Sequence, residues 1–233
     1  MILELFTNEF QYICFFVLAT IGYTYFDRFL AKKNIEGRYY FLHSLNNAVI
    51  TYCTYPSVLY SYTNITTFYN YERSIIAPIL TGSLHTYHII EYKHKFTYYD
   101  YLHHTIMCVV ALPFGLYINS GSVFDHSLFY TTGLPGMIDY FLLFLVRNDK
   151  IKKITEKKIN NYINLWIRCP GCISTTVLSM VAFCYAPDNI FTFKERMMVL
   201  LTGFIVFWNG IYFMNLVVVD YAQQKLIKER KIT

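Results

Sequence analysis

Charged residues are scarce in this chain of 233 residues, which is 55% hydrophobic and only 15% charged, with a mean hydropathy of +0.32. A soluble domain normally carries about a quarter charged residues. The sequence also lacks an internal repeat, a low-complexity linker and any loop long enough to hold a separate soluble domain. These absences argue against an ordinary soluble enzyme and indicate a single membrane domain.

Lys and Arg are nearly missing from one side of the predicted membrane. Each of seven apolar stretches has roughly the 17–25 residues that cross a bilayer, at 10–26, 39–60, 75–92, 101–118, 123–146, 163–185 and 197–219. The segments after spans one, three, five and seven carry 16 of the 20 Lys and Arg, and the N-terminus and other connections carry 3. Short loops rich in Lys and Arg stay in the cytosol. The sequence therefore predicts an all-α membrane protein with seven transmembrane helices, an exterior N-terminus and a cytosolic C-terminus.

Positive charge is also missing from the N-terminus, where the first ten residues carry Glu4 and Glu9 and no Lys or Arg. A secretory signal peptide begins with positive charge, so we expect span one to be retained. None of the six cysteines lies in an exterior loop, which argues against a disulfide framework. The one glycosylation sequon, Asn64-Ile-Thr66, falls in an exterior loop, the side on which glycosylation occurs.

We divide the chain into a first helix with its cytosolic loop (1–36), a six-helix membrane domain (37–220) and a basic cytosolic tail (221–233). The tail ends in Arg230-Lys231-Ile-Thr, which is close to a dibasic retrieval signal and predicts residence in the endoplasmic reticulum. The net charge of +5 comes mainly from the cytosolic segments. It fits contact with anionic lipid headgroups and gives no reason to expect nucleic acid as a partner.

Ionisable residues gather in the cytosolic half of the predicted spans. Such residues are costly at membrane depth and usually face the protein interior. We therefore expect spans two to seven to surround a polar cavity. The residues predicted to line or serve it are His43, His85, His88, Glu91, Asp100, His103, His104, Asp139 and Arg168.

Asp100 and the pair His103-His104 form the pattern that most resembles a catalytic site. A carboxylate three residues before adjacent histidines can orient an imidazole as a general base or a nucleophile. A structural role, as hydrogen-bond partners between helices, stays open for each histidine. His126, beside Asp125 on the exterior side, is expected at the membrane interface.

Several of these segments resemble the TLC-domain family, the membrane proteins related to ceramide synthases and translocating-chain-associating proteins. The resemblance runs from Arg38 to His43, continues through Tyr87-His-Ile-Ile-Glu91, and is strongest at His103-His104, which matches the paired histidines of the family. It covers about residues 37–220. It implies a six-helix lipid-modifying domain and places catalysis on His103, His104 and Asp139, and on no further residue. Asp100 is a candidate from its spacing to the paired histidines alone. His43, His85, His88, Glu91 and Arg168 are then candidates for substrate binding.

One departure from the family divides the functional hypotheses. Ceramide synthases carry a His-Asp-x-x-Asp stretch after the paired histidines, whereas this chain reads Pro135-Gly-Met-Ile-Asp139. The first hypothesis is acyl transfer from acyl-CoA to a lipid amine or hydroxyl, with no other cofactor and no metal. The second is a non-catalytic protein that binds or regulates membrane lipids. A fatty-acid elongase, a di-iron oxygenase and a seven-helix receptor fit less well, because their His boxes or cysteine and Asp/Glu-Arg-Tyr patterns are incomplete here.

Overall fold

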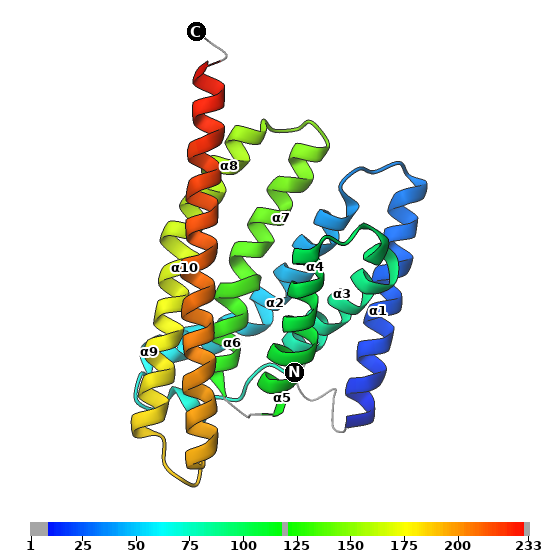
Figure 1. Ribbon diagram of the computed structural model, residues 1–233. Helices are drawn as coiled ribbons and strands as arrows, with labels where there is room; N and C mark the ends of the chain where they lie inside the picture. Colours follow the sequence, from blue (N-terminus) through cyan, green and yellow to red (C-terminus); the bar gives the residue numbers. More distant parts are fainter. Residues whose placement is uncertain (1–8, 118–120, 231–233) are drawn as a thin grey trace.

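The computed structural model describes residues 9–117 and 121–230, and this part of the chain is helical without any strand. Helix makes up 86% of the structure (Figure 1). The α-helices are α1 (Glu9–Lys32), α2 (Arg38–Thr63), α3 (Ile76–Tyr92), α4 (Tyr98–Thr105), α5 (Leu112–Tyr117), α6 (Ser122–Leu128), α7 (Leu134–Arg147), α8 (Lys153–Ile163), α9 (Cys169–Tyr185) and α10 (Phe193–Arg230). Two 3₁₀ turns, η2 (Phe68–Asn70) and η3 (Lys93–Lys95), lie in connections.

Three π-helical segments join shorter helices into longer runs. They are η4 (Ile106–Ala111) between α4 and α5, η5 (Phe129–Gly133) between α6 and α7, and η6 (Asn164–Arg168) between α8 and α9. A π turn inserts an extra residue into the helical ladder and is frequent at functional sites. Apart from Ile75 at the start of the third stretch, every one of the seven apolar stretches predicted from the sequence is helical wherever the structure describes it.

Four helical runs are long and apolar enough to cross a membrane, fewer than the seven predicted. They are Glu9–Lys32, Ser122–Arg147, Lys153–Tyr185 and Phe193–Arg230. The other predicted spans correspond to α2, α3 and the α4–α5 run. Helix α3 has only 17 residues, and α2 buries several polar side chains, including His43, Asn46 and Asn47, which lower its apolar character.

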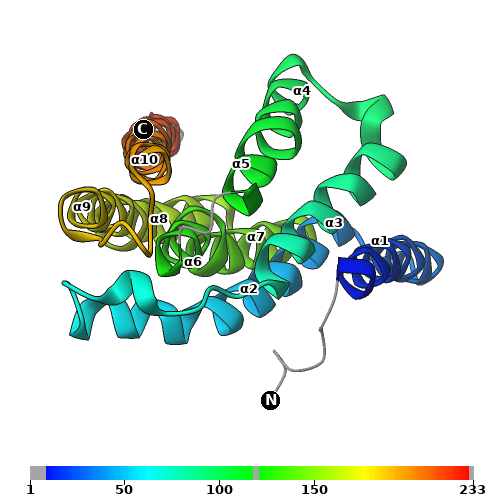
Figure 2. The same cartoon turned by 90° about the horizontal axis from the view of Figure 1, so that it is seen from below.

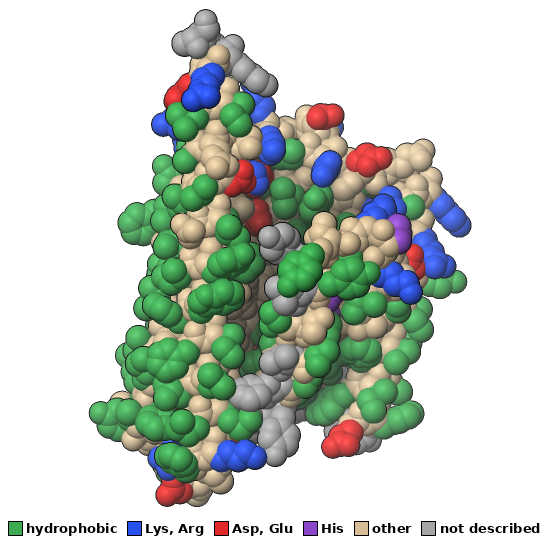
Figure 3. Space-filling view, viewed as in Figure 1, with side chains coloured by type: hydrophobic (Ala, Val, Ile, Leu, Met, Phe, Trp, Pro, Cys, Tyr) green, Lys and Arg blue, Asp and Glu red, His purple; other side chains and the backbone are tan. Residues whose placement is uncertain are grey.

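The helical runs alternate in direction, so their connections gather at two ends of the molecule (Figure 1). One end, here called the basic end, holds the connections at 33–37, 93–97 and 148–152 and the end of α10. The connections at 64–75 and 186–192 lie at the opposite end. Charged side chains gather towards both ends, and hydrophobic side chains cover most of the middle (Figure 3). This distribution suits a chain whose middle meets hydrocarbon.

Helices α9 and α10 approach closely because α10 presents glycines to α9. A Cβ added at Gly203 would lie 2.6 Å from Ser179, and one at Gly210 would lie 2.6 Å from Cys172. The Thr176 hydroxyl donates to the Gly203 carbonyl at 2.8 Å, which satisfies a polar group inside the seam. Small residues at such seams are the usual way for membrane helices to pack.

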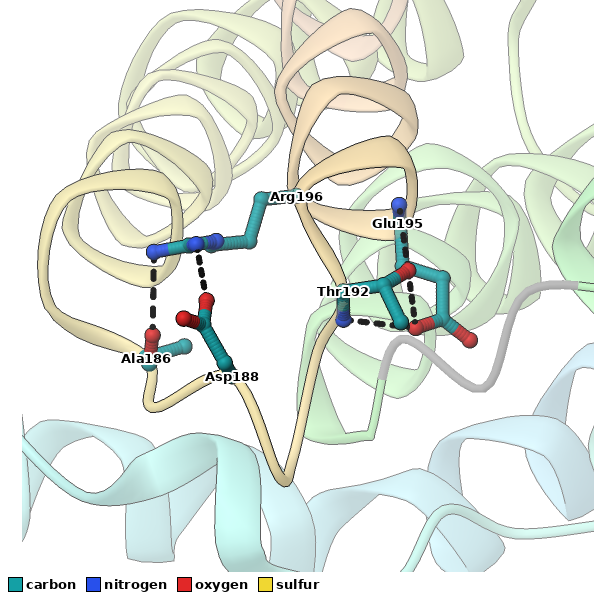
Figure 4. Close-up of polar contacts among 5 residues, drawn as sticks. All are labelled: Ala186, Asp188, Thr192, Glu195 and Arg196. Atoms are coloured by element: carbon teal, nitrogen blue, oxygen red, sulfur yellow. Dashed lines mark hydrogen bonds and ion pairs between the residues drawn. The ribbon is translucent and has the colours of Figure 1, made fainter.

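The turn between α9 and α10 is held by two sets of polar contacts (Figure 4). Glu195 accepts hydrogen bonds from the backbone and hydroxyl of Thr192, at 2.8 and 2.7 Å, and so caps the start of α10. Arg196 donates to the Ala186 carbonyl at 3.3 Å and pairs with Asp188. Both sets pin the hairpin at the opposite end.

A buried ion pair ties α1 to the rest of the bundle near the basic end. The Asp27 side chain is 6% exposed, and one carboxylate oxygen lies 2.8 Å from Nε of Arg38 and 2.9 Å from the hydroxyl of Tyr92. These three residues come from α1, α2 and α3. The contact therefore fixes the first helix against the two helices that carry His43 and His88.

Candidate functional site

A polar cavity of about 190 Å³ lies inside the bundle. It is lined from α2, α3, η4, η5, α7, α8, η6 and α10, so each of the predicted spans two to seven contributes to its wall. Its polar lining residues are His43, Asn46, Asn47, Thr81, His85, Thr131, Thr132, Asp139, Tyr140, Asn160, Asn164, Arg168 and Asn209. Figure 2 shows α4 and α5 standing apart from α10, and Figure 3 shows a hollow between them. Met107 of η4 and Phe213 of α10 line the cavity from these two sides.

Arg168 and Asp139 place opposite charges in this cavity without an ion pair between them in the described part of the chain. The Arg168 guanidinium lies 4.2 Å from the centre of the Phe213 ring, and it reaches Oδ1 of Asn209 at 3.4 Å. Oδ1 of Asp139 has no hydrogen-bond partner among the described residues. A half-buried cation and a half-buried acid that do not pair with each other can accept a ligand with its own polar groups.

Four histidines gather beside the cavity, towards the basic end. We call His43, His85, His88 and His104 the basic-end histidine cluster. His43 stacks on His88 with ring centres 4.1 Å apart, and His104 lies edge-on to His85 at 5.3 Å and to His88 at 5.7 Å. Tyr39 packs against His43 and His88 at 4.3 and 4.5 Å. Three helices thus bring together histidines that the sequence separates by up to 61 positions.

The hydrogen bonds of this cluster define which ring nitrogen carries the proton. Nδ1 of His43, His85 and His104 lies 3.0, 2.7 and 2.7 Å from the backbone carbonyl four residues earlier. A carbonyl only accepts, so Nδ1 is the donor in each ring. In the neutral ring, Nε2 then holds the lone pair that a general base, nucleophile or ligand contact requires. His85 lines the cavity itself.

Two acids predicted for the site lie elsewhere. Glu91 does not line the cavity, and its carboxylate pairs with Arg28 of α1 at 2.8 Å. The Asp100 carboxylate accepts from the backbone and hydroxyl of Thr97, both at 2.7 Å, and caps α4. Asp100 reaches His104 through its backbone carbonyl. The backbone of His103 belongs to α4, and the side chain predicted to be catalytic lies outside the described part of the structure.

His126, predicted to lie at the membrane interface, is enclosed by the protein. Its side chain is fully buried, with Nδ1 2.7 Å from Oγ1 of Thr175 and its ring packed against Tyr62 and Tyr130 at 5.2 and 4.9 Å. The neighbouring Asp125 is also buried and accepts from the Ser74 backbone at 2.8 Å. Burial followed from the partners on α2 and α9, which the position of His126 along the chain did not reveal.

The sequence reasoning missed the amides and Tyr140. Asn46, Asn47, Asn160, Asn164 and Asn209 all line the cavity, and the Tyr140 ring stacks 4.2 Å from His43. Asparagines inside or beside apolar stretches were the available signal, because an amide at membrane depth needs partners. Among the described residues, no group of three or more His, Cys, Asp or Glu side chains is arranged to hold a metal ion.

The arrangement as a whole is a polar chamber with a cation, an acid and amides, bordered by histidines whose Nδ1 atoms are engaged. Such a chamber can bind a polar group and exchange a proton with it. Comparison of the chain with protein families, with curated proteins and with solved structures finds no match.

Proposed function

We propose that this chain is a multi-pass membrane protein that takes the polar head of a membrane lipid into the cavity. The observation that carries the proposal is the presence of Arg168 and Asp139 in one chamber without a shared ion pair among the described residues. A lipid head with both an anionic and a donor group satisfies both side chains at once. The hollow between α10 and the α4–α5 run offers such a lipid a path from the side (Figure 3).

Seven membrane crossings, with an exterior N-terminus and the basic end in the cytosol, belong to this proposal. The alternating helical runs and the enrichment of Lys and Arg at the basic end support it. Helices α2 and α3 are then spans whose polar side chains face the cavity instead of lipid. We also propose that the chain is a divergent TLC-domain protein of the endoplasmic reticulum. Epitope tags in the 33–37 and 186–192 connections, probed after selective permeabilisation, are expected to report opposite sides.

Lipid binding is tested by the lipids that copurify with the protein. Hydrogen bonds to a charged group are worth about 1.5–3 kcal/mol, so Arg168→Gln is expected to weaken the affinity for the lipid roughly ten- to hundredfold. The amount of lipid that copurifies should fall accordingly. Mass spectrometry of the purified protein measures this. Lys158→Gln removes the same charge from an exposed position on α8 and serves as the matched control. Equal lipid retention by the two variants would contradict the proposal.

Acyl transfer is the second candidate, favoured by the position of His104 beside His85 at the cavity. Nε2 of His104 or His103 would take the proton from a lipid hydroxyl or amine as that group attacks the thioester carbonyl of acyl-CoA. The carbon–sulfur bond then breaks, and the proton passes to the departing CoA thiolate. The basic loops at the same end suit the phosphates of CoA.

The two candidates separate on turnover. If acyl transfer occurs, His104→Ala is expected to slow it about 10²–10⁴-fold, which is the contribution of a lost general base. Purified protein supplied with a panel of acyl-CoAs and lipid acceptors measures the rate. Lipid binding without turnover across the panel would eliminate acyl transfer and leave the binding function.

A further inference from the structure

A second hollow, separate from the cavity, lies on the outer surface between α2, η5, η6 and the start of α9. We call it the outer groove. Its volume is about 470 Å³, within the range of roughly 300–1,000 Å³ typical of small-molecule sites. Tyr55, Leu59 and Trp166 form exposed apolar walls, with 54%, 51% and 74% of their surface uncovered. Adjacent residues of η5 face different spaces, since Tyr130 lines the groove and Thr131 lines the cavity.

Three hydroxyl groups form a hydrogen-bonded chain at this groove. The Tyr62 hydroxyl lies 3.0 Å from the Tyr130 hydroxyl and 2.9 Å from Oγ of Ser174. Ser174 in turn donates to the Gly171 carbonyl at 2.8 Å. The Tyr130 ring packs directly on the α9 backbone at Gly171, where an added Cβ would overlap it. The position of the terminal hydroxyl is therefore built into the fold.

Counting protons gives the direction of each hydrogen bond among these three hydroxyl groups. Each hydroxyl has a single proton. Ser174 uses its proton on the Gly171 carbonyl, so Tyr62 must donate to Ser174, and Tyr130 must then donate to Tyr62. The chain ends at the Tyr130 oxygen, which has lone pairs and no proton left. A ligand at this end has to be a hydrogen-bond donor.

In the proposed seven-span topology, on which this step rests, the hydroxyl chain lies below the ends of the bundle, within the hydrocarbon. At 1.5 Å per residue, Tyr130 is about 12 Å along the helical run that starts at Ser122, and Ser174 is about 16 Å from the end of α9 at Tyr185. An ammonium group is costly at this depth, which favours a neutral donor. A hydroxyl oxygen that faces hydrocarbon is also stabilised when it accepts a hydrogen bond.

We propose that the outer groove binds a membrane lipid through a free hydroxyl group, which donates to the Tyr130 oxygen while the hydrocarbon lies along Tyr55, Leu59 and Trp166. The site goes beyond the lipid-head cavity, because its lining residues and its selectivity are different. It accepts an alcohol and rejects the ether or ester of the same shape, since an ether can only accept a hydrogen bond.

A pair of photoreactive probes tests this on the unmutated full chain in nanodiscs. The probes are a diazirine-bearing hexadecanol and its methyl ether, and mass spectrometry locates the cross-links. The alcohol is expected to label the α2 and η6 walls about three- to tenfold more strongly than the ether, the usual worth of one net hydrogen bond. Equal labelling by both probes, or labelling by neither, overturns the proposal without any variant.

Two variants sharpen the result. Tyr130→Phe removes the terminal oxygen and is expected to lower alcohol labelling towards the ether level. Tyr62→Phe frees the proton of Tyr130, so the preference for alcohol over ether is expected to fall because the ether gains a donor. Tyr52→Phe on the same helix is the matched control, since Tyr52 is 73% exposed, does not line the groove, and its hydroxyl makes no hydrogen bond with any described residue. Unchanged selectivity in a folded Tyr62→Phe protein, judged by its elution in detergent, would contradict the proton count.

Discussion

Near the basic end, His43, His85, His88 and His104 have ring centres between 4.1 and 6.2 Å from a neighbouring histidine, whereas His126 is the one histidine in its described surroundings. The two regions share their ring chemistry. Thr175 donates its only proton to the Gly171 carbonyl at 2.9 Å, so Nδ1 of His126 is again the donor. In both regions Nε2 is left with the lone pair.

The regions differ in what the rings can reach. His43 and His85 line the polar cavity, while His126 is completely enclosed by α2, η5 and α9. Nε2 of His126 has no hydrogen-bond partner among the described residues. The same side chain therefore occupies two different environments in one fold. Among the described histidine side chains, only His43 and His85 border a space that a ligand could enter.

The largest stability effect is expected from His126→Ala, which would break the enclosed region. Emptying this fully buried position removes contacts with two tyrosine rings and leaves a cavity, at a cost of about 3 kcal/mol in the free energy of unfolding. Thermal unfolding in detergent measures it. His94→Ala, at an exposed position of η3, is the matched control and is expected to change stability by less than about 0.5 kcal/mol.

His126→Ala also tests the comparison between the regions. Any lipid binding or turnover at the cavity should survive in the fraction of protein that stays folded, because His126 does not line the cavity. A His126→Ala protein that is as stable as His94→Ala would show that enclosure is not the role of this histidine.

A smaller effect is expected from Asp27→Ala, which loosens the support of the basic-end cluster. Removing one partner of a buried ion pair costs about 3–5 kcal/mol. The Arg38 side chain is 32% exposed and can be hydrated, so we expect about 2 kcal/mol here. Glu91→Ala breaks the more exposed pair with Arg28 and should cost no more than about 1 kcal/mol. Denaturation of both variants in one detergent measures the difference, and a reversed order would contradict the role of Asp27.

The smallest effect is expected from Gly136→Ala, which alters the cavity region alone. The new Cβ would lie 2.5 Å from Nδ2 of Asn47, the terminal amide of a buried, cavity-lining side chain that must shift, so the cost should be about 1 kcal/mol. The amount of lipid that copurifies with Gly136→Ala should fall as well. Gly22→Ala in α1 has no atom within 4 Å of the new Cβ and should be neutral or slightly stabilising. Equal lipid retention in the two variants would place the lipid outside the cavity.

Much of the fold was predictable because hydrophobicity and charge are local properties. Apart from Ile75, the seven apolar stretches are helical wherever described. Lys and Arg are enriched at the end where the connections at 33–37, 93–97 and 148–152 meet. A Thr-x-x-Asp pattern at Thr97 was also visible, and it explains the capping role of Asp100 better than a catalytic role does. The number of long apolar helices differs from the prediction, four against seven, because α2 and α3 carry polar side chains that reduce their apolar character.

The candidate site was also predictable only in part. Sequence position placed His43, His85, Asp139 and Arg168 in the same half of the predicted membrane, and all four line the cavity. Helical periodicity also put Glu91 on the same face as His85 and His88, yet Glu91 pairs with α1. Helix α1 packs against that part of the α3 face, so Glu91 contacts α1 and does not reach the cavity.

By itself, the sequence determined that this protein is helical, where its apolar stretches begin and end, and which end of the bundle is basic. These follow from side-chain hydrophobicity and charge along one chain. Only the tertiary structure decided that His126 is enclosed, that Glu91 faces α1, and that the Tyr62, Tyr130 and Ser174 hydroxyls form one directed chain. Each of these depends on atoms from helices far apart in sequence, and hydrogen bonds of about 3 Å are set by how those helices pack.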